Sequence, residues 1–149
     1  MKSVLLFRIA AILALLQYAA HGLMFSTYKP SHGQAEINFV NEMKTQFWIF
    51  GGHPRSYWDF YFGYGLLSVL SGLIEVLLLF YAARTAKHYP ELAKRVAIIL
   101  FIGVLCHLLL VQRYFFLLPA VFDFIIAGIL VTAIRTKTVI PSENKAMAF

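Results

Sequence analysis

The chain has 149 residues, of which 60% are hydrophobic and only 13% are charged. This composition excludes an ordinary soluble domain and points to the bilayer, where a spanning helix needs about 20 mostly apolar residues. The formal net charge is +6, but the basic residues flank the apolar runs and form no patch, so we expect no nucleic-acid partner. The single cysteine, Cys106, excludes an internal disulfide.

Four apolar runs predict an all-α, integral membrane four-helix bundle that forms one domain over residues 1–149. The predicted spans are 3–27, 57–83, 96–116 and 119–134. The last two are separated by a very short link, and Pro119 suits the first turn of a helix, so they should form an antiparallel hairpin. A cleaved signal peptide is the alternative for the first run, but Arg8 interrupts its apolar stretch.

The basic residues predict how the spans are oriented. They are concentrated in the 84–95 loop and in the tail, 135–149, and are sparser between the first two spans. Because cytoplasmic loops are enriched in lysine and arginine, both termini and the tail should be cytoplasmic. The 28–56 segment should then lie outside.

That outer segment has the pattern of an amphipathic helix over about residues 35–50. Its apolar residues recur every three or four positions: Ile37, Val40, Met43, Phe47 and Phe50. Such a helix is expected to lie on the membrane surface or across the mouth of the bundle. The Gly51-Gly52 pair is expected to end it.

The run RSYWDFYFGYG, residues 55–65, opens the second span and contains six residues with predicted structural roles: Arg55, Ser56, Trp58, Asp59, Gly63 and Gly65. Ser56 and Asp59 have the spacing of a capping box, in which each side chain accepts the other's backbone N–H. Arg55 and Trp58 are predicted interfacial anchors. The two glycines should let neighbouring helices approach closely.

Polar or small residues recur along one face of each span, and such residues avoid lipid. In the first span they are Ala10, Ala14, Gln17 and His21. In the second they are Tyr57, Tyr61, Tyr64, Ser68, Ser71 and Glu75. In the third they are Gly103, His107, Leu110 and Tyr114, and in the fourth Asp123, Ala127 and Leu130. These faces are expected to meet in a polar seam.

The outer half of the seam provides the candidate ligand-binding residues: His21, Tyr57, Tyr61, Tyr64, His107, Arg113 and Asp123. Either histidine can ligate a metal or haem, but no span contains an HxxxH or ExxH pair, so we predict no metal site. The simpler interpretation is a buried histidine bonded to a tyrosine or a carboxylate. Asp123 and Arg113 either grip a polar head group or form an ion pair that fixes helix register. Glu75 is expected to lie apart, in the inner half.

The chain resembles a family of small bacterial four-helix inner-membrane proteins without an established activity. The resemblance rests on His21-Gly22, Phe50-Gly51 and the RSYWDFY-x-G-x-G-L run from Arg55 to Leu66. The overall plan is also similar to that of the DoxX-like proteins, at the level of fold alone. The resemblance implies a multi-pass location in the bacterial inner membrane and assigns no cofactor or substrate.

Three classes of function stay open. The leading hypothesis is a non-enzymatic accessory subunit, or a binder of a lipophilic ligand such as a quinone or lipid, near the outer membrane face. The second is an intramembrane enzyme acting on a lipid or quinone through His21, Asp123 and Arg113. The third is a passive assembly or packing factor. A larger membrane complex and a homo-oligomer are both compatible with the sequence.

Overall fold

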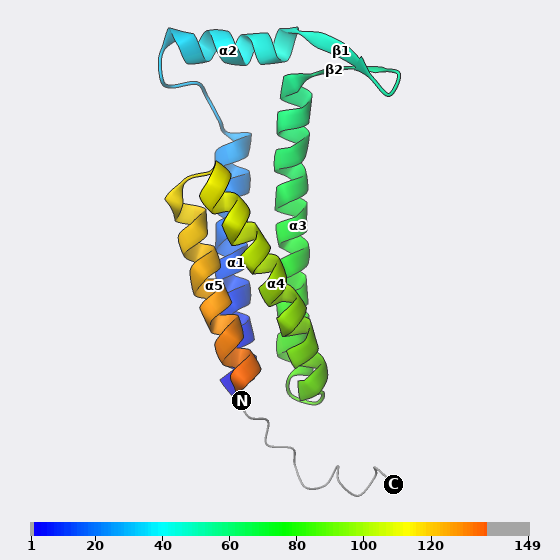
Figure 1. Cartoon of the computed structure of the whole chain (residues 1–149), viewed down its shortest axis with the longest axis vertical. Coiled ribbons are helices and arrows are strands. Elements are labelled where there is room, and N and C mark those ends of the chain that lie inside the picture. Colours follow the sequence, from blue (N-terminus) through cyan, green and yellow to red (C-terminus); the bar gives the residue numbers. More distant parts are fainter. Residues whose placement is uncertain (1, 137–149) are drawn as a thin grey trace, which may run out of the picture. The chain divides into compact units, whose positions relative to one another are not determined.

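A computed structural model describes residues 2–136 (Figure 1). Its elements are α1 (Lys2–Ser26), α2 (Gln34–Thr45), β1 (Phe47–Phe50), β2 (His53–Ser56), α3 (Tyr57–Thr85), α4 (Pro90–Tyr114) and α5 (Leu117–Arg135). Helices α1, α3, α4 and α5 are each long and apolar enough to cross a membrane, as predicted. Most of the predicted cytoplasmic tail, from residue 137 onward, lies outside the described residues.

The chain divides into two compact units, and each is described by itself. The hairpin unit is Leu15–Ile74 and contains α2, both strands and the adjoining parts of α1 and α3. The α4–α5 unit contains, of the described residues, 2–14 and 75–136.

In the α4–α5 unit, α4 and α5 pack as the predicted helical hairpin, joined through Phe115 and Phe116. Pro119 lies in the first turn of α5. Helix α4 begins at Pro90, six residues before the predicted span, because a proline at the first helical position and Glu91 in the first turn both favour a helix start. The end of the 84–95 loop is therefore helical.

The buried faces of α1 and α5 are the predicted ones, whereas that of α4 is not. Ala10, Ala14 and Gln17 are buried in α1, His21 of the predicted face is only half-buried, and Arg8 is exposed. The buried residues of α5 include the three predicted: Asp123, Ala127 and Leu130. Helix α4 instead buries Ala93, Ala97, Leu100, Val104 and Val111. Gly103, Leu110 and Tyr114 are exposed. The helix packs through its alanine and valine positions, so its buried face is rotated by about one residue from the predicted face.

In the hairpin unit, the end of α1 and the start of α3 pack closely and antiparallel. A Cβ atom added at Gly65 would lie 2.2 Å from Phe25 Cζ, and one at Gly72 would lie 2.1 Å from Tyr18 Cγ. The contacting positions rise along α3 as they fall along α1, which is the pattern of antiparallel helices. The close approach predicted at Gly65 is thus confirmed. At Gly63 it is wrong, because a Cβ there would meet no described atom within 4 Å.

The outer segment is partly helical, and its second half is a β-hairpin. Helix α2 ends at Thr45, and Phe47–Phe50 pairs antiparallel with His53–Ser56. The residues FWIF favour a strand, and Gly51 and Gly52 have φ values of 55° and 82°, as a two-residue type I′ turn requires. The predicted helix over 35–50 is therefore wrong beyond Thr45, and the fold is mainly helical rather than purely all-α.

Candidate functional site

The α4–α5 unit contains a polar pair between helices α4 and α5. His107 Nδ1, on α4, lies 2.8 Å from Asp123 Oδ2, on α5. The Asp123 side chain is 3% exposed and that of His107 is 34% exposed. In the tautomer that carries its proton on Nδ1, His107 donates this hydrogen bond to the carboxyl oxygen of Asp123. Of the predicted interpretation, a buried histidine bonded to a tyrosine or a carboxylate, the bond to a carboxylate is confirmed, whereas His107 is only part-buried.

Arg113 is not the residue that the structure pairs with Asp123. Its guanidinium lies 5.8 Å from the ring centroid of its neighbour Tyr114, and its side chain is exposed. The reason is the register of the hairpin. His107 and Asp123 lie at similar distances from the α4–α5 connection, whereas Arg113 lies beside it. Counting outward from Phe115 and Phe116 would have identified the pair from sequence.

Glu75 belongs to the same unit, through α3, and is half-buried. That it lies apart from the His107–Asp123 pair stays a prediction. Among residues 2–136, no group of three or more histidine, cysteine or acidic residues has an arrangement able to hold a metal ion.

An open hollow of about 630 Å³ lies next to the α4–α5 connection. It is lined by Leu108, Gln112, Phe115, Phe116, Leu117, Ala120, Val121 and Phe124. Only Gln112 has a polar side chain. Leu108 and Phe124 directly follow His107 and Asp123 in the chain, so the same two helices build the pair and the hollow. A hollow of this size is typical of sites for small organic ligands, which occupy roughly 300–1,000 Å³.

In the hairpin unit, His21 and Tyr61 both contact Phe25. The ring centroids of His21 and Phe25 are 6.0 Å apart, and those of Phe25 and Tyr61 are 5.1 Å apart. Trp58 joins the cluster, 5.4 Å from Tyr61, and Lys44 Nζ lies 4.4 Å from the Trp58 ring centroid. The predicted anchor Trp58 is therefore part of an aromatic cluster with a cation–π contact.

On α3, the residues that were predicted to form the buried face are not the buried ones, so this prediction is wrong. Tyr57, Tyr61 and Tyr64 are exposed, and the buried residues lie about one position around the helix, at Gly72, Val76, Leu79, Ala82 and Ala83. Small and aliphatic residues allow close helix packing. Tyrosines near the end of a span can keep their hydroxyls at the interface, so nothing forces them inward.

The predicted capping box at the start of α3 is confirmed. The backbone N–H of Ser56 donates to Asp59 Oδ2 at 2.8 Å, and that of Asp59 donates to Ser56 Oγ at 3.2 Å. Ser56 is buried and Asp59 is exposed. These bonds satisfy two N–H groups that a helix start leaves without helical partners. Both residues are therefore structural.

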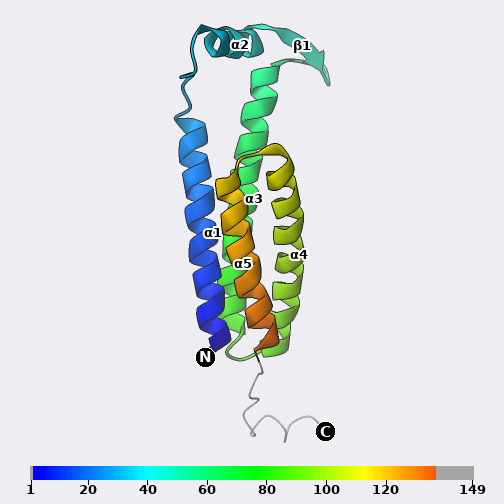
Figure 2. The ribbon, with the colours of Figure 1, turned by 60° about the vertical axis from the view of Figure 1, so that its left-hand side comes forward.

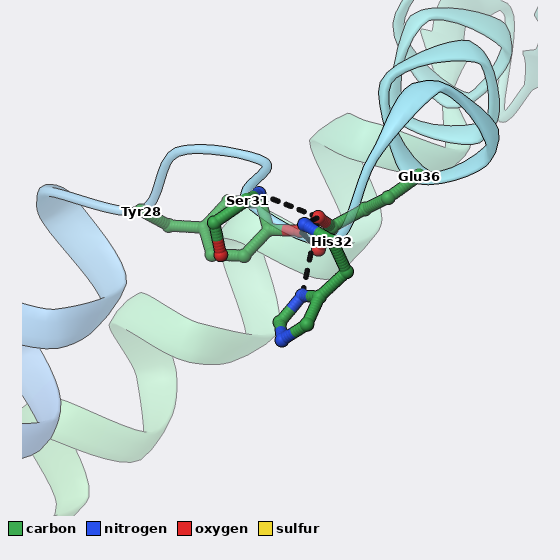
Figure 3. A network of polar contacts seen from close by, with 4 residues as sticks. All are labelled: Tyr28, Ser31, His32 and Glu36. Atoms are coloured by element: carbon green, nitrogen blue, oxygen red, sulfur yellow. Dashed lines mark hydrogen bonds and ion pairs between the residues drawn. The ribbon is translucent and has the colours of Figure 1, made fainter.

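A second polar network, which the sequence did not reveal, fixes the start of α2 (Figure 3). Tyr28 Oη donates to Glu36 Oε1 at 2.6 Å, and the backbone N–H groups of Ser31 and His32 donate to Oε2 at 2.6 Å. The bond from Tyr28 is the main cause that lowers the pKa of Glu36 to about 2, and the same bond raises the pKa of Tyr28 to about 12. Glu36 lies in the first helical turn, so the network ties residues 28–32 to the start of α2.

The candidate residues thus fall into two groups. His107 and Asp123 are paired in the α4–α5 unit, where Arg113 is exposed. His21 and Tyr61 contact one phenylalanine in the hairpin unit, where Tyr57 packs against Trp48 and Tyr64 is exposed. The residues of the enzyme hypothesis, His21 with Asp123 and Arg113, belong to different units.

No protein-family model, no curated protein and no solved structure matches the chain. The family resemblance and the bacterial inner-membrane location therefore stay predictions.

Proposed function

We propose that this chain is a non-enzymatic, multi-pass membrane protein that binds an amphiphilic, lipophilic molecule at the α4–α5 hairpin. The apolar part of the ligand occupies the hollow, and an oxygen atom of its head group accepts a hydrogen bond from His107. The observation that carries this proposal is the construction of the hollow and the His107–Asp123 pair from the same two helices.

The lining of the hollow favours a lipophilic ligand. Seven of its eight residues are apolar, and α4 and α5 are both long enough to span a membrane. Water gains few hydrogen bonds in such a space, whereas an acyl or isoprenoid chain gains dispersion contacts with the leucine and phenylalanine side chains.

The geometry of the pair favours His107 as the residue that meets the ligand. A third of its side chain is accessible, whereas Asp123 is almost fully buried. A carboxylate that holds one ring nitrogen fixes the orientation of an imidazole and thereby directs the other. Quinone carbonyls and lipid phosphates are both hydrogen-bond acceptors, so the geometry suits a quinone and a phospholipid equally well.

The proposal includes an orientation and a location. Both termini are cytoplasmic, the α4–α5 connection faces outward, and the protein lies in the bacterial inner membrane. The distribution of lysine and arginine supports this orientation. The ligand then enters from the outer leaflet.

The test compares two tryptophan substitutions on α5. Val121 lines the hollow and is 42% exposed, whereas Ile125 is 45% exposed and does not line it. The full chain is purified in mild detergent, and bound quinone and phospholipid are quantified by mass spectrometry. Val121→Trp should lower ligand retention about tenfold, equivalent to about 1.4 kcal/mol, and Ile125→Trp should not. Equal retention in the two variants, or no ligand above the detergent background in the wild type, would overturn the proposal.

A second comparison tests the head-group contact with His107 and distinguishes a quinone from a phospholipid as the ligand. His107→Phe keeps an aromatic ring and removes the nitrogens, so it should weaken binding of the oxygen-bearing ligand and leave binding of a plain alkane probe unchanged. Reconstitution with a short-chain quinone or with phosphatidylglycerol separates the two sources. Loss of alkane binding as well would show that His107 acts through packing alone.

A further inference from the structure

The β-hairpin has two faces, and its pairing register assigns residues to them. The opposed pairs are Phe47 with Ser56, Trp48 with Arg55, Ile49 with Pro54, and Phe50 with His53. Opposed residues in an antiparallel pair point to the same face, and successive residues alternate. One face therefore contains Trp48, Phe50, His53 and Arg55, and the other contains Phe47, Ile49, Pro54 and Ser56.

The first face packs on the start of α3. Trp48 lies 4.6 Å from Tyr57 and Phe50 lies 4.7 Å from Phe60, measured between ring centroids. Both contacts are edge-on, one of the two arrangements that aromatic rings prefer. The hairpin is thus held at the level of the first helical turn of a predicted membrane span.

Strand β1 is apolar on both faces and exposed on both. Phe47 is 61% exposed and Ile49 is 73% exposed on one face, and Trp48 and Phe50 are also exposed on the other. A strand on a soluble surface alternates apolar and polar residues, with only one side covered. Four consecutive exposed apolar residues suit a medium that surrounds the strand from both sides.

We propose that the hairpin is embedded in the interfacial layer of the lipid bilayer, among the phospholipid head groups. Its position is continuous with the membrane span, because β2 ends at Ser56 and α3 begins at Tyr57. Figures 1 and 2 show the strands running across the axis of α3 at its start. Because a spanning helix crosses the bilayer, strands in this direction run along the membrane plane in our proposal. This proposal does not depend on the ligand proposed for the α4–α5 hairpin.

Charge and backbone chemistry place the hairpin in the head-group layer and not in the hydrocarbon core. Arg55 and Lys44 are cationic, and phosphate groups complement them. Tryptophan and tyrosine are enriched at this level in membrane proteins. A two-stranded sheet has open edges, whose backbone groups need water or head-group oxygens and find neither in hydrocarbon.

The edge of β2 is poorly suited to pairing with a strand from a partner protein. Pro54 has no N–H to donate, and Arg55 Nη1 donates to the Pro54 carbonyl oxygen at 2.8 Å. Proline and a charged side chain are features that block strand addition at an edge. A protein partner is therefore an outcome that the test must be able to detect.

The test measures the depth of a fluorescent label in the full chain, reconstituted in phosphatidylcholine vesicles. In a Cys106→Ala background, Ile49→Cys reports the hairpin, and Ile102→Cys reports the middle of α4. Both isoleucines are exposed, so the label replaces no packed side chain. Nitroxides on the lipid head group, or at carbon 5 or carbon 12 of the acyl chain, serve as quenchers.

We expect the head-group and carbon-5 nitroxides to quench the label at position 49 at least twofold more than the carbon-12 nitroxide does. At position 102 the carbon-12 nitroxide should be the strongest quencher. Phe47→Ser should halve the lipid quenching at Ile49. Phe39→Ser, which removes an equally exposed phenylalanine (62%) from α2, should not. Full quenching by aqueous iodide without lipid quenching would overturn the proposal in favour of a water-facing docking surface. Strongest quenching from carbon 12 would also overturn it, because the hairpin would then lie in the hydrocarbon core.

Discussion

Replacing Gly72 by alanine tests whether close helix approach stabilises the hairpin unit. A Cβ at this position would lie 2.1 Å from Tyr18 Cγ and 2.2 and 2.3 Å from the two Cδ atoms. Carbon atoms in contact are about 3.5–4.0 Å apart, so something must move by more than about 1 Å. The atoms met belong to the root of the ring, and Tyr18 is buried, so the tyrosine cannot move aside without displacing its helix.

The expected magnitude follows from two opposing effects. Overpacking a well-packed site costs about 1–3 kcal/mol. Alanine is favoured over glycine within a helix by about 1 kcal/mol. Because the overlap at Gly72 is severe, we take the upper end of the overpacking range, about 3 kcal/mol, and subtract the alanine gain of about 1 kcal/mol, so Gly72→Ala should lower the free energy of unfolding by about 2 kcal/mol. Gly65→Ala should cost less, because it meets the outer end of the Phe25 ring, which is easier to displace. Gly63→Ala meets no described atom within 4 Å and should be neutral or stabilising.

The assay is a double-mutant cycle, with the free energy of unfolding measured by SDS titration in mixed micelles. Tyr18→Ala removes the ring that the new methyl group would strike. If the clash is the cause, Gly72→Ala should cost at least about 1 kcal/mol less in the Tyr18→Ala background. An equal cost in both backgrounds would refute the reasoning, and so would a cost for Gly63→Ala as large as that for Gly72→Ala.

Three further predictions concern the caps and the orientation. Ser56→Ala should lower the free energy of unfolding by about 1 kcal/mol. Asp59→Asn should also lower it, and the two together should lower it by less than the sum, because each removes part of one reciprocal box; additive losses in SDS titration would contradict this. The pKa of Glu36 is lowered from its ordinary 4.5 to about 2, so its stabilising contribution is present above pH 4.5 and is lost as the pH falls toward 2. Glu36→Gln should weaken the pH dependence of the thermal unfolding midpoint over that range. If the variant and the wild type have the same pH dependence, the carboxylate does not have this role. In a cysteine-free background, Ser31→Cys should react with an impermeant maleimide in intact cells and Lys87→Cys only after permeabilisation; the opposite pattern would invert the proposed orientation.

The features that the sequence predicted correctly depend on local information. A membrane span needs only a sufficient apolar length, so the four helices follow from the order of residues. The capping box joins Ser56 and Asp59 within one turn, and its bonds form whatever the rest of the chain does. The α4–α5 hairpin follows from a connection too short for any other arrangement.

The β-hairpin was missed because its residues fit two patterns. Phe47 and Phe50 continue the helical spacing of α2, while the consecutive apolar residues from Phe47 to Phe50 also suit a strand. A short apolar run does not distinguish the two by periodicity. The deciding feature is the conformation of Gly51 and Gly52, which a sequence leaves open between the end of a helix and a tight turn.

Polar residues identified the buried face correctly only where their side chains could not reach the interface. Gln17 and Asp123 are buried as predicted, because their side chains are too short to reach the interface and are costly to expose to lipid. Tyr64 and Tyr114 have longer side chains, which can place the ring in lipid and extend the hydroxyl toward the interface, so these tyrosines do not identify the packed face. The stripe on α3 was assigned from such tyrosines. The same argument favours His107 and Asp123 over the tyrosines as the site, because these two shorter polar side chains meet between α4 and α5 and are joined there by a hydrogen bond.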